Sequence, residues 1–200
     1  MDFRVRDATW LFENHKTKSE QWWTSVFALV VVGLARRGSP TELPLWKYHR
    51  DATPQWFQPL PESFSFRGVD LSQIHIEAPL KDVFKEELPQ TTARPDVIIK
   101  DSRAHFASII ENKVLKAGIG NFKDYQDASA TLVEQGWDAR TLLLVSAGQS
   151  NDELWEAVAQ LNPQIMLWED VLRALDKIHW LAGLFNEELS AYYLRREVKD

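Results

Sequence analysis

The chain contains no cysteine, and its five histidines are scattered along it. Without cysteine, disulfides, thiolate zinc sites and cysteine nucleophiles are excluded, which suits a reducing compartment. The histidines show neither a His-Glu-x-x-His motif nor any other zinc spacing, so none is a good candidate for a metal ligand. A Gly-x-Ser-x-Gly elbow and a Walker phosphate loop are also missing, which argues against a serine hydrolase and an NTPase.

The sequence also lacks long apolar runs. The longest, residues 26–35, has about half the length that a membrane-spanning helix needs. The first residues are polar and do not form the apolar segment of a signal peptide. We therefore expect a soluble, cytoplasmic protein.

Positive charge is scarcer than negative charge, and the formal net charge is -6. Phosphate binding normally calls for a basic surface, so this balance counts against a nucleic-acid enzyme. The distribution of charge matters more than the total, because carboxylates that bind a metal make a nuclease site acidic before the ion arrives. The first quarter of the chain does concentrate lysine and arginine, although an ordinary solubilising surface explains this equally well.

The residues that are present fit one globular domain. The chain has 200 residues, of which 44% are hydrophobic and 26% are charged. This is enough for a sizeable core, and neither an internal repeat nor a low-complexity tract divides the chain. We expect a single domain over residues 1–200.

Two apolar segments, residues 94–100 and 108–114, carry charged side chains where a plain core strand would carry none. Side chains two positions apart on a strand share a face, so Glu111 and Lys113 should project together. Asp96 lies on the first of the two segments. The segments therefore predict a hairpin with a cluster of charge on one of its faces.

The register of this hairpin decides whether the carboxylates meet. If Asp101 and Phe106 pair at the strand ends around a four-residue loop, the ladder places Asp96 opposite Glu111. Opposed residues of an antiparallel pair lie on the same face of the sheet. This register predicts two carboxylates and one ammonium at a single place.

Such a cluster has a natural chemistry, because two carboxylates in close proximity repel unless a positive charge lies between them. Mg²⁺ is the best candidate, with Mn²⁺ as an alternative, since it takes one or two protein carboxylates and leaves room for phosphate oxygens. The ion would acidify a water, while Lys113 would hold that water or stabilise the transition state. The predicted reaction is hydrolysis of nucleic acid. The alternative is a solvated strand face on which Glu111 and Lys113 form a surface ion pair, worth under about 1 kcal/mol.

These residues resemble the signature of the PD-(D/E)XK nuclease superfamily, which has Pro-Asp on one strand and Glu-x-Lys on the next. Pro95-Asp96 and Glu111-Asn112-Lys113 match it, including the apolar run beside each. The resemblance implies an α/β, restriction-endonuclease-like core in the order helix, three antiparallel strands, helix and parallel strand. It also implies that Asp96, Glu111 and the main-chain carbonyl of Asn112 bind the metal, and that Lys113 is the catalytic lysine. DNA as substrate and a homodimer that cuts both strands are further implications.

The first helix is predicted over residues 17–37, because apolar side chains recur at helical spacing and Gly38 and Pro40 follow. Nucleases that resemble this chain often supply another acidic residue from this helix. Glu20 is our candidate for that role at the metal site, and Glu13, seven residues earlier, is the second choice. The alternative for Glu20 is that it only favours the positive end of the helix.

A later helix, predicted over residues 121–135, carries candidate accessory residues. The corresponding helix of the resembled family has a Gln-Leu-x-x-Tyr pattern, and residues 121–125 are similar, with Asn121 in the glutamine position and Tyr125 in the tyrosine position. Asparagine keeps the amide but is one methylene shorter. Lys123 would contact phosphate or lie on a solvated helix face.

Residues 40–72 contain five prolines and many aromatic side chains, without a clear period. We predict an irregular excursion there, whose aromatic residues stack on unpaired bases or else anchor the excursion to the core or to a second subunit.

The remaining segments complete the pattern of alternating helices and strands. Strands are predicted over residues 73–78, 141–146 and 164–167. A short helix is predicted over residues 81–88, and a second helix begins with a capping box from Ser150 to Glu153 and ends at residue 161. The last segment, residues 168–198, is predicted to be helical with a break near Asp176.

Three functions remain in competition at this point. The first is a Mg²⁺-dependent endonuclease acting on DNA. The second is a binding or interaction module that has the same fold and an unused site, which the acidic net charge favours. The third is an unrelated α/β domain with coincidental carboxylates, which requires that Asp96 and Glu111 lie too far apart to share an ion.

Overall fold

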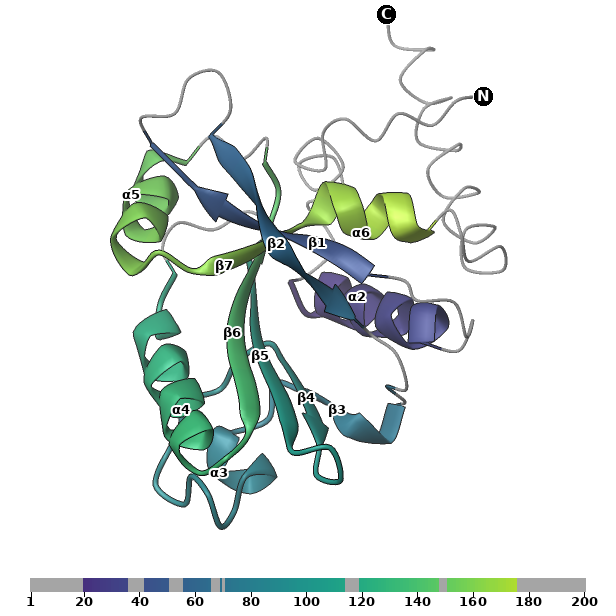
Figure 1. The fold of residues 1–200 in the computed structure, drawn as a ribbon, viewed down its shortest axis with the longest axis vertical. Helices are drawn as coiled ribbons and strands as arrows, with labels where there is room; N and C mark the ends of the chain where they lie inside the picture. Colours follow the sequence, from purple (N-terminus) through teal and green to yellow (C-terminus); the bar gives the residue numbers. More distant parts are fainter. Residues whose placement is uncertain are drawn as a thin grey trace, which may run out of the picture.

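A computed structural model shows an α/β fold in which helices flank a seven-stranded mixed sheet (Figure 1). The residues that the structure describes are 20–35, 42–50, 56–65, 69, 71–113, 119–147 and 151–175. For residues 20–22, 71 and 175 it describes the backbone and not the side chain.

The sheet has the strand order β2-β1-β7-β6-β5-β4-β3. Strands β5, β6 and β7 are parallel to one another, and the other neighbours are antiparallel. The strands are β1 (Glu42–Tyr48), β2 (Phe57–Ser65), β3 (Ile74–Ile76), β4 (Val97–Asp101), β5 (Phe106–Lys113), β6 (Asp138–Val145) and β7 (Gln164–Leu167). The helices are α2 (Glu20–Ala35), α3 (Leu80–Val83), α4 (Phe122–Glu134), α5 (Asp152–Leu161) and α6 (Trp168–Leu175), with a 3-10 turn η1 at Leu71–Gln73.

The hairpin of β4 and β5 has the register that the sequence predicts. Asp101 pairs with Phe106, and the ladder continues to Val97 opposite Ile110. The carboxylate of Asp101 closes the loop because its Oδ1 accepts hydrogen bonds from the backbone N–H groups of Arg103 and Ala104, at 2.9 and 3.1 Å. An aspartate that binds the backbone two and three residues ahead stabilises a tight turn. Local turn chemistry therefore fixes which residues of the two strands face each other.

Each face of the sheet is covered by its own pair of longer helices. Figure 1 shows α2 and α6 on one side of the sheet and α4 and α5 on the other. Apolar side chains of α2 and α6 form one core with Val97, Ile99 and Ile110. Those of α4 and α5 form the second core, which includes Ile98 and Ile109. Because neighbouring strand residues alternate between the two cores, each residue of β4 and β5 can be assigned to a face.

The segment expected to be an irregular excursion instead contains β1 and β2. They form a hairpin that extends the main sheet, since Trp46 pairs with Ile165 of β7. The prediction was wrong there because prolines obscure the strand pattern, although an edge strand such as β2 tolerates them. Several of its aromatic residues serve packing: Tyr48 stacks on Trp155 of α5 with ring centroids 4.9 Å apart, and Phe64 is buried. Trp56, in contrast, is 52% exposed. Phe66, another aromatic residue of this segment, lies outside the described residues.

Several predicted elements differ from the structure at their ends. Helix α3 covers only the beginning of the segment expected to be helical. Helix α5 is capped by Asn151, whose side chain accepts a hydrogen bond from the N–H of Leu154, whereas Ser150 lies outside the described residues. Helix α6 begins where predicted, and the residues after it, including Asp176, are not described. No helix in the described ranges is long and apolar enough to cross a membrane.

Candidate functional site

The candidate site lies where β4 begins and β5 ends, on the face of the sheet that α4 covers. Ile98 and Ile109 point into the core on this face. Asp96 is two residues before Ile98, and Glu111 and Lys113 are two and four residues after Ile109. Strand alternation therefore directs all three charged side chains to the same face. Extending the observed register by one step places Asp96 opposite Glu111, as predicted.

Glu111 and Lys113 form a direct ion pair. Lys113 Nζ lies 2.6 Å from Glu111 Oε1, and the two side chains are only 12% and 9% exposed. Water screens exposed ion pairs strongly and buried pairs much less. The structure therefore differs from the solvated strand face that was the alternative explanation of this pattern.

Asp96 is half-buried and is tied to β5 through its side chain. Its Oδ2 accepts a hydrogen bond of 2.6 Å from the backbone N–H of Asn112. Its own carbonyl oxygen accepts from the N–H of Glu77, just after β3, at 3.0 Å. The residue is thus fixed from both neighbouring strands, which holds its carboxylate beside the Glu111–Lys113 pair.

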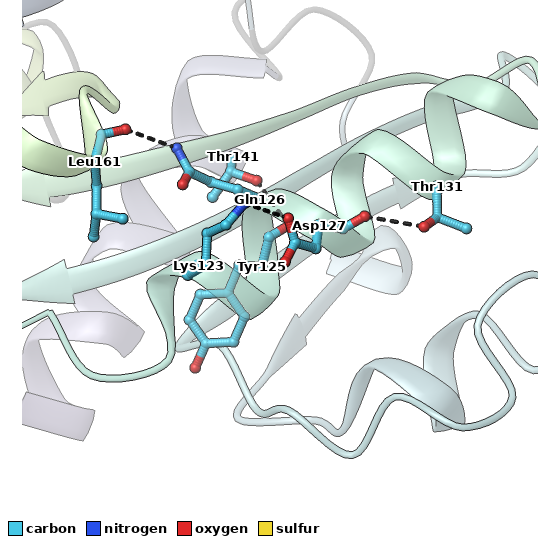
Figure 2. A network of polar contacts seen from close by, with 7 residues as sticks. All are labelled: Lys123, Tyr125, Gln126, Asp127, Thr131, Thr141 and Leu161. Atoms are coloured by element: carbon cyan, nitrogen blue, oxygen red, sulfur yellow. Dashed lines mark hydrogen bonds and ion pairs between the residues drawn. The ribbon is translucent and has the colours of Figure 1, made fainter.

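Tyr125 joins this group from α4. Its hydroxyl donates a hydrogen bond of 2.8 Å to the carbonyl oxygen of Arg94, just before Asp96. The main-chain carbonyl of Tyr125 accepts from the hydroxyl of Thr141 on β6 at 3.0 Å, which fixes this turn of the helix (Figure 2). Burial raises the pKa of Tyr125, and the carboxylates of Glu111 and Asp96 raise it further. The phenol of Tyr125 therefore lies within electrostatic range of both carboxylates.

The other two accessory candidates on this helix have exposed side chains. Lys123 is 65% exposed and pairs with Asp127 on the next turn of α4, with Nζ 2.5 Å from Oδ1 (Figure 2). This is the solvated helix face that was the alternative for Lys123. Asn121 is exposed at the N-cap position of α4, and its side chain makes no capping hydrogen bond.

Glu20 is the first residue of α2, on the opposite face of the sheet from Glu111. It precedes Thr24 by one helical turn, and Thr24 contacts Asn112. The start of α2 therefore lies next to the end of β5. The side chain of Glu20 and the whole of Glu13 lie outside the described residues, so their predicted role stays a prediction.

Sequence reasoning missed the role of the Asn112 side chain, which is fully buried. Its Nδ2 donates to the hydroxyl oxygen of Thr24 at 3.2 Å, and its Oδ1 accepts from the indole Nε1 of Trp168 at 2.9 Å. The signal that could have revealed it is an amide at a strand position that alternation directs into an apolar core, because a buried amide requires partners.

A second buried carboxylate that the motif does not predict lies beside the end of β6. Glu169 Oε1 accepts hydrogen bonds from the hydroxyl of Ser146 at 2.6 Å and from the N–H of Ala147 at 3.2 Å. Val145, just before Ser146, pairs with Lys113 across the parallel ladder. Glu169 thus fixes the loop that follows the strand next to the site.

A polar cleft of about 340 Å³ lies between α4 and the segment that leads to β4. Threonines line it together with Asp124 and Asp127, and none of its lining residues is basic. A phosphate backbone requires positive charge. This cleft is therefore not suited to hold the backbone of a nucleic acid.

The donor set at the site fits a hard divalent cation that keeps most of its waters. Asp96 and Glu111 supply carboxylate oxygens, and each carboxylate offers about four acceptor positions. Mg²⁺ commonly takes one or two protein carboxylates and completes its shell with water and phosphate. Within the described ranges no group of three or more histidine, cysteine, aspartate or glutamate side chains could hold a metal. A site built here would therefore rely on two carboxylates and main-chain oxygen.

Comparison with known proteins does not assign a family. No family model matches the chain, and searches of curated proteins and of solved structures gave no match either. Membership of the PD-(D/E)XK superfamily therefore remains a prediction from the motif.

Proposed function

We propose that this protein is a Mg²⁺-dependent nuclease of the PD-(D/E)XK type that hydrolyses phosphodiester bonds in DNA. The observation that carries the proposal is the association of Asp96, Glu111 and Lys113 on one face of the sheet, around a 2.6 Å ion pair with little exposure to water. A lone Glu-x-Lys on a surface strand would have neither the second carboxylate nor the burial.

The residues have distinct roles in this proposal. Asp96, Glu111 and the main-chain carbonyl of Asn112 would hold the ion. When bound, the ion would neutralise charge on the phosphate and acidify a water. Lys113 would turn from Glu111 toward that water and orient it for attack, or stabilise negative charge on the phosphoryl oxygens. Tyr125 would keep its proton, and with it the hydrogen bond to the carbonyl oxygen of Arg94 beside the carboxylates, since its raised pKa favours the neutral phenol. A homodimer would place one such site on each DNA strand.

The proposal is tested by measuring cleavage of plasmid and single-stranded DNA in Mg²⁺ or Mn²⁺. We expect Asp96→Asn and Lys113→Met to abolish cleavage while the protein remains folded. Lys100→Met is the matched control for Lys113, because Lys100 lies on the adjacent strand and its side chain is similarly buried, at 15% exposure. Asp138→Asn is the control for Asp96, since Asp138 lies at the opposite end of the sheet beside Phe106. Cleavage that persists in Asp96→Asn and Lys113→Met would disprove the assignment of the site.

A second candidate function is an interaction module with the same fold and no catalysis. The net charge of -6 favours it, as does the shorter amide of Asn121 in the glutamine position, which is exposed and makes no capping hydrogen bond. The two candidates differ in metal binding, because an ion that binds the folded state stabilises it by mass action. A rise in melting temperature with millimolar Mn²⁺ that is lost in Asp96→Asn supports the nuclease. An unchanged melting temperature together with intact DNA supports the module.

A further inference from the structure

The main-chain ladder between β4 and β5 ends just before the candidate site. The last pair is Val97 with Ile110, and Glu111 to Lys113 extend beyond it. On the other edge β5 remains paired with β6 as far as Lys113. On the β4 side, the N–H of Asn112 donates a hydrogen bond of 2.6 Å to Asp96 Oδ2 across the gap. Asn112 therefore helps to set the relative position of the two carboxylates.

Asn112 is held in place from the opposite face of the sheet. Its side chain is fully buried and binds Thr24 of α2 and Trp168 of α6. An indole N–H can only donate, so the amide oxygen must face Trp168 and the amide nitrogen must face Thr24. The two partners thus fix the orientation of the amide as well as its position.

The helices that carry these partners are locked to each other by aromatic contacts. The ring of Trp168 lies edge-to-face against Trp23 and Phe27 of α2, with centroids 5.6 and 6.2 Å apart. Such contacts favour one geometry of the rings. The indole N–H of Trp168 is therefore directed at Asn112 by packing that does not involve the site.

We propose that Thr24, Asn112 and Trp168 form a positioning network that sets the separation of Asp96 and Glu111 and hence the affinity of the site for metal. This inference rests on the proposed nuclease function. The amide also specifies the register of the strand, because a shift of one residue would turn Asn112 toward α4 and bury the charges of Glu111 and Lys113 in the opposite core. The network acts through Asn112, because Thr24 and Trp168 contact its side chain from the face of the sheet opposite Glu111.

The test uses substitutions at the two partners, which lie outside the site. Thr24→Val and Trp168→Phe each remove one hydrogen bond to Asn112 and leave β5 unchanged. We expect the Mg²⁺ concentration for half-maximal cleavage to rise about 10-fold, as is typical when a partner that orients a metal ligand is lost, with an unchanged KM for DNA. Thr24→Ser keeps the hydroxyl, so this variant should need the same Mg²⁺ concentration for half-maximal cleavage as the wild type.

Controls separate positioning from loss of stability. Val30→Ala and Val171→Ala remove buried methyl groups from the same two helices, since both valines are fully buried. At an equal fall in melting temperature, these variants should keep the wild-type Mg²⁺ requirement. The inference is overturned if the controls raise the Mg²⁺ requirement as much as Thr24→Val does, or if Thr24→Val leaves it unchanged.

A measurement without metal distinguishes failure of the network from failure of the proposed function. Hydrogen exchange at the amide of Asn112 reports its bond to Asp96 directly. In Thr24→Val this amide should exchange about 10-fold faster relative to core amides of β5, by local opening, and in Val30→Ala it should not. If the wild-type protein neither cleaves DNA nor binds metal, the proposed function fails, and faster exchange still supports the network. Unchanged protection in Thr24→Val refutes the network whatever the activity.

Discussion

Replacing Lys113 by methionine should destabilise the protein far more than loss of a surface lysine. The substitution keeps the length of the side chain but removes the charge that neutralises Glu111, whose side chain is 9% exposed. Removal of one partner from a buried ion pair costs about 3–5 kcal/mol, because the remaining charge is uncompensated. We take the lower value, about 3 kcal/mol, because both side chains retain some contact with water.

Two further variants identify the origin of this cost. In the double variant Glu111→Gln with Lys113→Met, both charges are gone, and a neutral pair of similar size should recover the free energy of unfolding to within about 1 kcal/mol. Lys123→Met provides the exposed control, since it breaks the pair with Asp127 on α4. Pairs of that kind contribute about 0.3–0.5 kcal/mol.

Mg²⁺ should reduce the cost of Lys113→Met, because the ion replaces the missing positive charge between the carboxylates. An ion present at ten times its dissociation constant stabilises the folded state by about 1.4 kcal/mol. The assay is urea denaturation of the full chain with EDTA and with 10 mM Mg²⁺, a concentration of about the order that weak sites require. The reasoning is refuted if Lys113→Met costs less than about 1 kcal/mol and Mg²⁺ has no effect, since this is the behaviour of a surface pair.

Four other predictions concern residues around the site and in the sheet. The pKa of Tyr125 is raised above its usual value of 10.0, first by burial and then by Glu111 and Asp96. As the pH rises above 10.0, the unfolded chain therefore loses this proton before the folded protein does, and the free energy of unfolding should fall. Tyr125→Phe should cost about 1 kcal/mol at neutral pH through the lost bond to Arg94, and its unfolding curves should approach those of the wild type above pH 10; a constant difference would contradict the coupling. Lys100 donates to the carbonyl of Val83 and lies over the rings of Phe84 and Trp137, so Lys100→Met should cost about 2 kcal/mol. Burial, and then the charge of Lys100, lower the pKa of His75; the neutral ring therefore contributes stability that is lost as the pH falls below 6.5, and an NMR titration of Lys100→Met should show the pKa of His75 raised. Ser108 is fully buried and its hydroxyl has no hydrogen-bond partner within the described ranges, so Ser108→Ala should raise the free energy of unfolding by about 1 kcal/mol. If urea denaturation instead shows that this free energy falls by a similar amount, the hydroxyl is paired.

The features predicted correctly from the sequence depend on local chemistry. The register of β4 and β5 follows from the short loop that Asp101 closes, and the face shared by Glu111 and Lys113 follows from strand alternation. The buried parallel strand β6 follows from an uninterrupted apolar run. Each of these signals is contained in a few neighbouring residues, which is why one sequence was sufficient.

The features that the sequence did not predict depend on partners far along the chain. Trp46 donates its indole N–H to Asp170, which is 124 residues away, and this bond ties the β1–β2 hairpin to α6. Asn112 binds Thr24 and Trp168, at separations of 88 and 56 residues. Neither periodicity nor turn chemistry carries information about such pairs. The position of Glu20 relative to the carboxylates is of the same kind and is still a prediction.

The order in which the chain is synthesised gives the Thr24–Asn112–Trp168 network a further consequence. Asp96, Glu111, Lys113 and Tyr125 belong to one short stretch of sequence, and local contacts of this kind form rapidly. Trp168 leaves the ribosome later, at a rate of about 5–20 residues per second. The charged cluster can therefore assemble during translation, several seconds at most before α6 closes the opposite face of the sheet. Until that last step a nascent chain would bind metal more weakly, so the proposed cleavage of nucleic acid would be slower while the chain is still being made.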